Sequence, residues 1–329
     1  MKGRALRFAR PRTVEVVDVE VPEPRPGEVL VRTRYSGISG GTEMLAYRGE
    51  LDPGLPLDET IGALGGTFAY PFHYGYSCVG EVVASQGELR EGATVFALHP
   101  HQDVFVSPGP DAVNVEGVDP RVATLFPLVE TALQISLDAA PRFGDAVVVT
   151  GLGAVGILAA AMLERAGARV VGSEPKPWRR EIAGSFGITT ASPDELESVV
   201  KEISDSRGLD VLVEASGNPS VLGESLRLLR HEGTALVASW YGTKVAALPL
   251  GAEFHRRRLT IKSSQVSTIP ASLEGWDRQR RRAAARSLLD ELPLGLLATH
   301  EFSFEEAPRA YAAIDQEEPG LIHAALRYQ

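Results

Sequence analysis

The sequence predicts an α/β protein of two domains, a β-rich domain at the N-terminus followed by a doubly wound parallel sheet. Two observations predict this class. Short runs of alternating apolar and polar residues, separated by Pro and Gly, fill the chain up to about residue 110, whereas apolar strands alternate with longer helical segments from about residue 120. The chain has 329 residues, 44% of them hydrophobic and 23% charged, which is enough for two cores.

The first part of the chain is expected to form an antiparallel, barrel-like β domain. Apolar and polar residues alternate at 14–19, 28–33 and 80–84, a period that is typical of a strand with one buried face. The segment 22–27 interrupts this pattern with three prolines and a glycine, so a turn is expected there.

The second part is expected to form the parallel sheet, because strand and helix alternate along it. The last part contains two amphipathic helical patterns and a closing strand, which we expect to return to the first domain. The expected elements are strands at 147–150, 168–171, 210–213 and 234–237, helices at 278–289 and 304–314, and a strand at 321–328.

Composition restricts the classes of function. The net charge of −10 gives no general reason to expect a nucleic-acid or membrane partner, so the arginine tracts 256–258 and 278–282 are interpreted as a solvated helix face or an inter-domain ion-pair cluster. Cys78 is the only cysteine, so no intrachain disulfide can form. No apolar stretch reaches the roughly 18 residues of a membrane span, and the N-terminus has no signal-peptide pattern. We therefore expect a cytoplasmic protein.

A Gly-x-Gly-x-x-Gly motif follows the apolar strand at 147–150 directly and opens an Ala-rich helix. Gly151 permits a tight turn, Gly153 lets the backbone approach a pyrophosphate, and Gly156 lets the helix lie close to the sheet. Ala154 and Val155 would present the unpaired N–H groups of the helix N-terminus to the phosphates. This strand, turn and helix predict a dinucleotide-binding site.

The next strand ends at a carboxylate, Glu174, about 20 residues after the motif. A carboxylate there can accept hydrogen bonds from the ribose hydroxyls and would repel a 2′-phosphate, which favours NAD. Lys176 and Arg179 keep NADP possible, because either cation could reach a 2′-phosphate, although a solvated basic pair is an alternative.

Two later strands also end in small or polar residues, at 214–217 and 239–242. Ligands of open α/β sheets lie beyond the carboxyl ends of the strands. Ser216, Gly217 and Trp240 are therefore candidate cofactor contacts.

Two N-terminal segments resemble motifs of the medium-chain dehydrogenase/reductase superfamily. Residues 35–43, Tyr-Ser-Gly-Ile-Ser-Gly-Gly-Thr-Glu, are similar to its Gly-Ile-Cys-x-Thr-Asp segment, and residues 75–82 are similar to its Gly-His-Glu-x-x-Gly-x-Val segment. With the glycine motif, the resemblance covers essentially the whole chain. It implies a GroES-like catalytic domain formed by 1–128 and 265–329 and a Rossmann domain formed by 129–264.

The metal-binding positions of the superfamily's zinc enzymes are changed here. The Cys position holds Ser39, or Gly40 because the segment is one residue longer, and the His position holds Tyr76. The third ligand position falls near Pro127. None of these side chains is a thiolate or an imidazole, so no catalytic zinc is expected.

A closer resemblance is to the zinc-less, bacteriochlorophyllide-dehydrogenase-like branch. The segment Ser36–Glu43 and the pair Trp240-Tyr241 are similar to its motifs. The resemblance implies a zinc-independent alcohol or ketone oxidoreductase, and it implies a homodimer in which residues 244–250 are a candidate pairing strand.

Without zinc, hydrogen-bond donors must stabilise the alkoxide that develops during hydride transfer. The resemblance places Thr42, Tyr76 and His99 around the substrate, with Tyr76 as a general acid and His99 as a proton shuttle that titrates near neutrality. The alternatives are that Thr42 only stabilises a turn, that the Tyr76 ring only fills a cavity, and that His99 is hydrogen-bonded within a loop. Thr131 is a candidate nicotinamide contact or a helix cap, and Ser264 a candidate contact at the domain junction.

A non-standard metal site is an alternative that the sequence also raises. His99, His101 and Asp103 alternate and would share one face of a strand, with His73 nearby in sequence. Pro100 favours an irregular loop instead, so we expect no metal.

The leading prediction is thus a zinc-independent oxidoreductase that transfers hydride between NAD(H), or NADP(H), and a secondary alcohol or ketone of a polar, ring-bearing substrate. An NADPH-dependent quinone or enone reductase is the first alternative, because a conjugated acceptor takes hydride without a metal. A nucleotide-binding protein without catalysis is the alternative from another class.

Overall fold

A computed structural model describes residues 1–329. The chain divides into two compact units, one formed by Met1–Pro127 with Arg286–Gln329 and the other by Leu128–Ala285. Both divisions fall inside helices, α3 (Phe126–Ala139) and α8 (Arg278–Glu291). The expected domain boundary after residue 128 lies beside the first division. The expected return to the first domain at residue 265 stays a prediction, since the second unit continues to Ala285.

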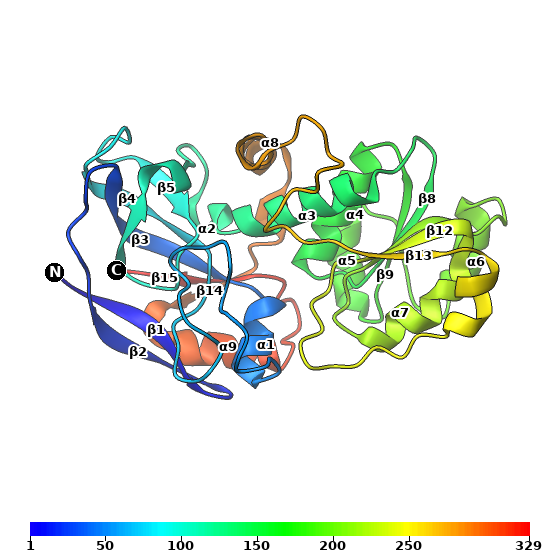
Figure 1. Ribbon diagram of the computed structural model, residues 1–329, viewed down its shortest axis with the longest axis horizontal. Helices are drawn as coiled ribbons and strands as arrows, with labels where there is room; N and C mark the ends of the chain where they lie inside the picture. Colours follow the sequence, from blue (N-terminus) through cyan, green and yellow to red (C-terminus); the bar gives the residue numbers. More distant parts are fainter. The chain divides into compact units, whose positions relative to one another are not determined.

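The first unit contains a seven-stranded sheet and a separate two-stranded hairpin (Figure 1). The hairpin pairs β1 with β2, and the sheet has the order β14-β15-β3-β4-β5-β7 with β6 paired to β3. Its elements are β1 (Lys2–Arg10), β2 (Thr13–Glu20), β3 (Glu28–Ile38), α1 (Thr42–Arg48), β4 (Cys78–Ser85), β5 (Thr94–Ala97), β6 (Val104–Pro108), β7 (Val113–Asn114), α2 (Pro120–Ala123), β14 (His300–Ser303), α9 (Ala307–Asp315) and β15 (Ala324–Arg327).

The predicted β-rich architecture of this unit is confirmed. The three predicted strands lie within β2, β3 and β4, and the predicted closing strand contains β15, which pairs antiparallel with β3. The C-terminal segment therefore completes the N-terminal sheet, as expected. The sequence patterns did not indicate β1, in which the alternation is broken by two adjacent buried residues, Ala5 and Leu6.

The core of the first unit contains a row of aromatic side chains that the chain supplies at every second position from Phe68 to Tyr76. The Phe8 ring stacks on Phe72, with centroids 5.2 Å apart. The Tyr74 ring meets Tyr76 edge to face at 6.2 Å. Because interiors are close-packed and aromatic contacts have preferred geometries, this row holds the Tyr76 ring against a rigid core.

The second unit contains a six-stranded parallel sheet with the order β10-β9-β8-β11-β12-β13 (Figure 1). The strand order reverses between β8 and β11, so the predicted doubly wound sheet is confirmed, with its switch point beside β8. Its elements are β8 (Ala146–Thr150), α4 (Ala154–Arg165), β9 (Arg169–Ser173), α5 (Pro177–Ser185), β10 (Thr190–Ala191), α6 (Leu196–Ile203), β11 (Leu209–Glu214), α7 (Pro219–Ser225), β12 (Leu229–Val237) and β13 (Thr260–Ser263).

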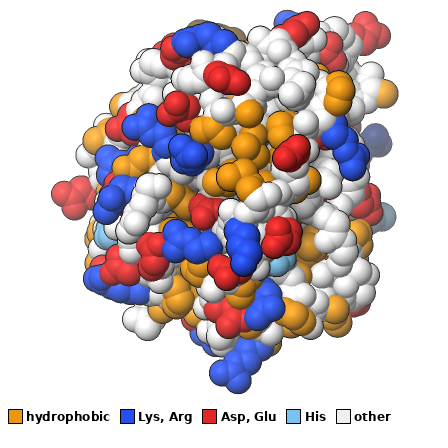
Figure 2. Space-filling model, turned by 90° about the vertical axis from the view of Figure 1, so that its left-hand side faces the viewer, with side chains coloured by type: hydrophobic (Ala, Val, Ile, Leu, Met, Phe, Trp, Pro, Cys, Tyr) orange, Lys and Arg blue, Asp and Glu red, His pale blue; other side chains and the backbone are white.

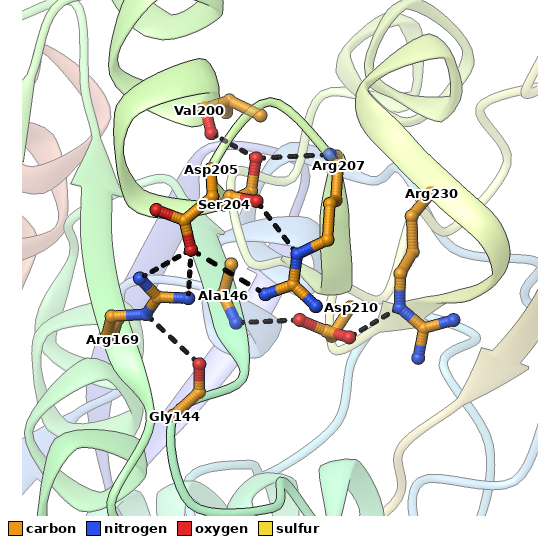
Figure 3. A network of polar contacts seen from close by, with 10 residues as sticks. Gly144, Ala146, Arg169, Val200, Ser204, Asp205, Arg207, Asp210 and Arg230 are labelled. Carbon is orange, nitrogen blue, oxygen red and sulfur yellow. Dashed lines mark hydrogen bonds and ion pairs between the residues drawn. The ribbon is translucent and has the colours of Figure 1, made fainter.

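A polar network joins the amino ends of the central strands of this sheet (Figure 3). Asp210 at the start of β11 accepts hydrogen bonds from the Ala146 N–H of β8, at 2.8 Å, and from Arg230 Nε of β12, at 2.5 Å. Arg169 of β9 pairs with Asp205 at 3.4 Å. Burial disfavours ionisation of Asp210, but the hydrogen bonds from Arg230 and Ala146 outweigh it, so the pKa of Asp210 lies below its ordinary value.

We expect Asp210→Asn to lower the free energy of unfolding at pH 7 by about 1–3 kcal/mol, because a charge-assisted hydrogen bond between two strands is lost. Since the pKa of Asp210 is lower in the folded than in the unfolded chain, its contribution is present above the unfolded pKa of about 3.9 and is lost as the pH falls through the folded pKa. Urea unfolding of both proteins at several pH values measures the difference, which should shrink at low pH.

Asp205→Asn is the matched control, because the Asp205 side chain is 70% exposed and its ion pair with Arg169 should contribute less than about 1 kcal/mol. Equal urea midpoints for Asp210→Asn and the unchanged protein would contradict the expectation.

Candidate functional site

The glycine motif of the second unit forms the turn between β8 and α4. Gly151 has φ +86°, its N–H donates to the Ser173 carbonyl at 2.8 Å, and a Cβ on it would lie 2.5 Å from Ser216 Cα. A Cβ on Gly156 would lie 1.9 Å from the Gly151 carbonyl oxygen. At this residue α4 therefore lies closer to the glycine turn than to strand β8. A Cβ on Gly153 would meet no atom within 4 Å. Gly151 and Gly156 are therefore required by packing, whereas Gly153 borders open space at the first residues of α4, Ala154 and Val155.

Glu174 is buried directly after β9, beside this turn. One carboxylate oxygen accepts the Leu152 N–H at 3.0 Å, and the other accepts the Lys176 N–H at 3.1 Å. The Arg179 guanidinium lies 3.8 Å from the same carboxylate and packs over the Trp178 ring. The carboxylate thus braces the glycine turn, a role that the sequence did not indicate, and Arg179 is held close to it.

The loop after β11 is organised by a buried carboxylate that sequence reasoning did not single out. Glu214 accepts hydrogen bonds from the Ser216 N–H at 2.7 Å, from the Ser216 hydroxyl, and from the Tyr241 hydroxyl at 2.6 Å. Burial and then the Glu214 charge raise the pKa of Tyr241. Gly217 N–H donates to Ser239 Oγ at 2.9 Å. Among the predicted cofactor contacts, Ser216 and Gly217 are therefore fixed in this loop, and the Trp240 side chain is exposed.

Two further predicted cofactor residues lie on α3 and after β13. Helix α3 begins at Phe126, so Thr131 lies inside the helix, and the alternative that it caps the helix start is wrong. The Ser264 hydroxyl donates to Asp138 Oδ2 of α3 at 2.7 Å, and its N–H donates to the Val237 carbonyl at 2.9 Å. Ser264 therefore joins α3 to the edge of the parallel sheet within the second unit.

In the first unit, the side chains of Ser39 and Thr42 lie beside the phenol of Tyr76. These two side chains act to lower the pKa of the phenol. Burial and the nearby charge of Glu43 act in the opposite direction and dominate, so the pKa of Tyr76 is raised to about 12. The phenol consequently stays protonated across the physiological range and can donate a proton or a hydrogen bond.

A chain of buried polar side chains lies behind these hydroxyl groups. Glu43 Oε1 accepts the Ser39 N–H at 2.8 Å, and Glu43 Oε2 is joined to His101 Nε2 at 2.9 Å. At the Glu43 end, the Tyr311 hydroxyl donates to Glu43 Oε2. At the His101 end, His101 Nδ1 is joined to Ser36 Oγ at 2.7 Å, and Ser36 shares a hydrogen bond of 2.9 Å with Tyr328. The sequence singled out none of Tyr311, Tyr328 or the His101–Glu43 pair, because these contacts join α1, β3 and the C-terminal segment.

His99 does not have the property expected of it. Its ring stacks on Phe105 with centroids 4.1 Å apart, and Nδ1 is hydrogen-bonded to the Pro100 carbonyl at 3.0 Å. Burial lowers the pKa of His99 to about 4, although the Pro100 hydrogen bond opposes this and His101 adds to it. The prediction that His99 titrates near neutrality is therefore wrong, because the ring is desolvated in a packed loop.

The four groups of the alternative metal site have separate partners. His101 faces Glu43 and Ser36, and His99 stacks on Phe105. Asp103 accepts the Arg4 N–H at 2.7 Å, and His73 Nδ1 is joined to the Leu6 carbonyl at 2.8 Å. No group of three or more His, Cys, Asp or Glu side chains is arranged to hold a metal ion.

The arginine tracts take part in ion pairs. Arg281 is buried and pairs with Glu130 of α3 at 3.1 Å, and Arg258 pairs with Glu232 at 3.2 Å. On the face shown in Figure 2, acidic and basic side chains are interspersed.

Every helix is too short or too polar to cross a bilayer.

Known proteins share this architecture. The family described as zinc-binding dehydrogenases matches residues 154–279. D-guloside 3-dehydrogenase of Escherichia coli K12 is 26% identical over 87% of this chain and 88% of its own. The 2-desacetyl-2-hydroxyethyl bacteriochlorophyllide A dehydrogenase of Cereibacter sphaeroides is 26% identical over 95% of this chain and 94% of its own. These matches support placement of the chain in the medium-chain dehydrogenase/reductase superfamily.

Solved structures of this superfamily have the same fold. The 2R,3R-butanediol dehydrogenase of Bacillus subtilis superposes with a TM-score of 0.80 at 19% identity over 99% of both chains. An alcohol dehydrogenase of Thermotoga maritima superposes with a TM-score of 0.78 at 19% identity over all of both chains. The dehydrogenase relatives support an alcohol dehydrogenase-like oxidoreductase, a class of enzyme that transfers hydride with a nicotinamide cofactor.

Proposed function

We propose that this medium-chain dehydrogenase/reductase transfers hydride between NAD(H) and a secondary alcohol or ketone without a catalytic zinc ion. The observation that carries the proposal is the Tyr76 phenol, which is packed against the aromatic core, stays protonated at neutral pH and lies beside the side chains of Ser39 and Thr42. The resemblance to the zinc enzymes implies that Tyr76 and either Ser39 or Gly40 stand at the metal-binding positions. A phenol there supplies a proton donor where the zinc enzymes have a Lewis acid.

The nucleotide is assigned to the glycine turn of the second unit. The open space beside Gly153 and the first N–H groups of α4 fit a pyrophosphate, which a helix N-terminus attracts. The buried carboxylate of Glu174 beside the turn favours ribose hydroxyls over a 2′-phosphate, so NAD is preferred, with Arg179 as the group that would admit NADP. The loop of Ser216 and Gly217, with Trp240, Thr131 and Ser264, completes the proposed contacts. When bound, the nicotinamide supplies or accepts the hydride.

The protein's own groups then handle the oxygen of the substrate. Tyr76 donates its proton to the oxygen of the reduced carbonyl, and in the other direction the phenolate receives the proton of the alcohol. Thr42 and Ser39 orient the phenol and stabilise the phenolate by hydrogen bonds, which is the direction in which they shift its pKa. His99, with its pKa of about 4, is neutral at pH 7. We therefore assign it to the lining of the proposed substrate site and not to proton transfer.

The residues present do not fit a catalytic zinc ion. Zinc is bound in proteins by thiolate, imidazole or carboxylate ligands, usually four in number with solvent. Tyr76 and Thr42 offer hydroxyl groups instead, and both ring nitrogens of His101, whose imidazole packs against Gly75, are hydrogen-bonded to Ser36 and Glu43. No step is therefore assigned to a metal.

The proposed substrate is a polar, ring-bearing secondary alcohol or ketone. The names of two relatives, D-guloside 3-dehydrogenase and a bacteriochlorophyllide dehydrogenase, refer to ring compounds, and this supports the class of substrate without identifying it. The homodimer and the cytoplasmic location remain predictions from the sequence.

The proposal is tested on the purified protein by titrating NADH and NADPH with intrinsic fluorescence, and then by assaying cyclic ketones against enones and quinones. We expect tighter binding of NADH, turnover of ketones, and activity that survives a chelator in protein with substoichiometric zinc by elemental analysis. Turnover of enones with NADPH instead would support the reductase alternative. Nucleotide binding without any turnover would support a non-catalytic role, and stoichiometric zinc that is needed for activity would contradict zinc independence.

A further inference from the structure

Glu43 and His101 form a pair of titratable groups that the proposed chemistry does not use. Both side chains are fully buried, and the atoms that join them are 2.9 Å apart. A buried polar pair of this kind is costly, and apolar residues of the same size often stabilise a core as well or better. Stability alone therefore does not account for the pair, and its contacts point to a further role.

Glu43 and His101 each contact one of two segments beside Tyr76, the Ser39–Thr42 loop and the Tyr74–Gly75 backbone. Glu43 Oε1 accepts the Ser39 N–H at 2.8 Å, and so fixes the loop whose Ser39 and Thr42 side chains lie beside the phenol. The backbone N–H of His101 donates to the Tyr74 carbonyl at 3.2 Å. Its ring packs against Gly75, where a Cβ would lie only 2.4 Å from His101 Cδ2. His101 thus contacts the backbone immediately before Tyr76 with both its own backbone N–H and its ring.

We propose that the Glu43–His101 pair is a positioning device for Tyr76, holding the Ser39–Thr42 loop on one side of the phenol and the Tyr74–Gly75 backbone on the other. This inference rests on the proposed function of Tyr76. Neither Glu43 nor His101 contacts the reacting atoms in this arrangement; both act through Tyr76.

The C-terminal segment supplies the outer supports of the pair. Tyr311 of α9 donates its hydroxyl to Glu43 Oε2, and Tyr328 after β15 binds Ser36, which in turn binds His101 Nδ1. With these bonds, both carboxylate oxygens of Glu43 and both ring nitrogens of His101 have a partner. A fully connected buried network is rigid, and placement of a catalytic group to within about 1 Å is worth on the order of a hundredfold in rate.

The test is a double-mutant cycle of Glu43→Gln and Tyr76→Phe. We expect Glu43→Gln alone to lower kcat for ketone reduction about tenfold or more, with little change in the dissociation constant of NADH. In the Tyr76→Phe background the same change should alter kcat by less than about twofold, because the group that the pair positions is gone. Equal effects in both backgrounds would mean a merely structural role and would overturn the inference.

The cycle separates this inference from the proposed function. An unchanged kcat in Tyr76→Phe alone would overturn the proposed function of Tyr76, and the inference with it. A loss of kcat in Tyr76→Phe together with an unchanged kcat in Glu43→Gln would overturn the inference alone.

Tyr311→Phe is the second variant if Glu43→Gln does not fold, because it removes only the hydroxyl that donates to Glu43. Its matched control is Tyr47→Phe, since the buried Tyr47 ring packs on Tyr311 at 5.3 Å and lies outside the hydrogen-bonded chain. We expect Tyr311→Phe to lower kcat more than Tyr47→Phe in the unchanged background and equally in the Tyr76→Phe background. Equal effects of the two variants in the unchanged background would overturn the inference.

Discussion

Replacing Tyr76 with Phe should lower kcat for ketone reduction by about 10²- to 10⁴-fold, the usual contribution of a general acid, while NADH binding is unchanged. The substitution removes only the hydroxyl, and the ring keeps its edge-to-face contact with Tyr74. Steady-state and single-turnover assays at saturating NADH measure the effect on the chemical step.

The dependence of this activity on pH is a check on the same residue. Because burial and Glu43 raise the pKa of Tyr76 to about 12, its proton is present at neutral and moderately alkaline pH and is lost only as the pH approaches that value. His99, with its pKa lowered to about 4, is already neutral above pH 6. Neither group should therefore produce a limb in kcat for reduction between about pH 6 and 9.

Tyr74→Phe and His99→Gln are the controls for Tyr76→Phe. Tyr74 is a buried member of the same aromatic row, so its change tests for a general effect of losing a tyrosine hydroxyl. His99→Gln compares the other candidate proton donor. A larger loss of kcat in His99→Gln than in Tyr76→Phe would contradict the assignment of Tyr76 as the acid.

The second large effect is expected at the third glycine of the turn. Gly156→Ala would place a Cβ 1.9 Å from the Gly151 carbonyl oxygen, so α4 or the turn must move. Overpacking of a rigid site usually costs about 1–3 kcal/mol, and here the displaced atoms are backbone on both sides. We expect a lower unfolding temperature and a loss of NADH binding, measured by thermal unfolding and fluorescence titration.

Gly153→Ala is the matched control at the same turn. A Cβ on Gly153 meets no protein atom within 4 Å, so the unfolding temperature should stay unchanged. NADH binding should nevertheless weaken, because the added methyl group occupies space that we assign to the pyrophosphate. Wild-type affinity in Gly153→Ala would contradict that assignment, and an unchanged Gly156→Ala protein would contradict the packing argument.

Local rules explain why much of the second unit could be predicted from the sequence. A continuous apolar strand, a glycine turn and an Ala-rich helix leave few alternatives, and the structure places β8, the turn and α4 where the motif indicated. The same rules predicted the doubly wound sheet, because strand and helix alternate along the chain. They did not predict that Glu174 braces the glycine turn or that Glu214 braces the loop that follows it. The sequence around a carboxylate looks the same whichever groups the carboxylate binds.

In the first unit, the sequence by itself determined the β-rich class, Thr42 and Tyr76 as candidates, and the absence of a thiolate or imidazole at the positions resembling zinc ligands. Only the tertiary structure decided that His99 is desolvated, and that Glu43 meets His101 and Tyr311, the latter 268 residues further along the chain. The physical reason is that pKa values and hydrogen-bond partners depend on which distant elements pack around a side chain, and local periodicity carries no record of those neighbours.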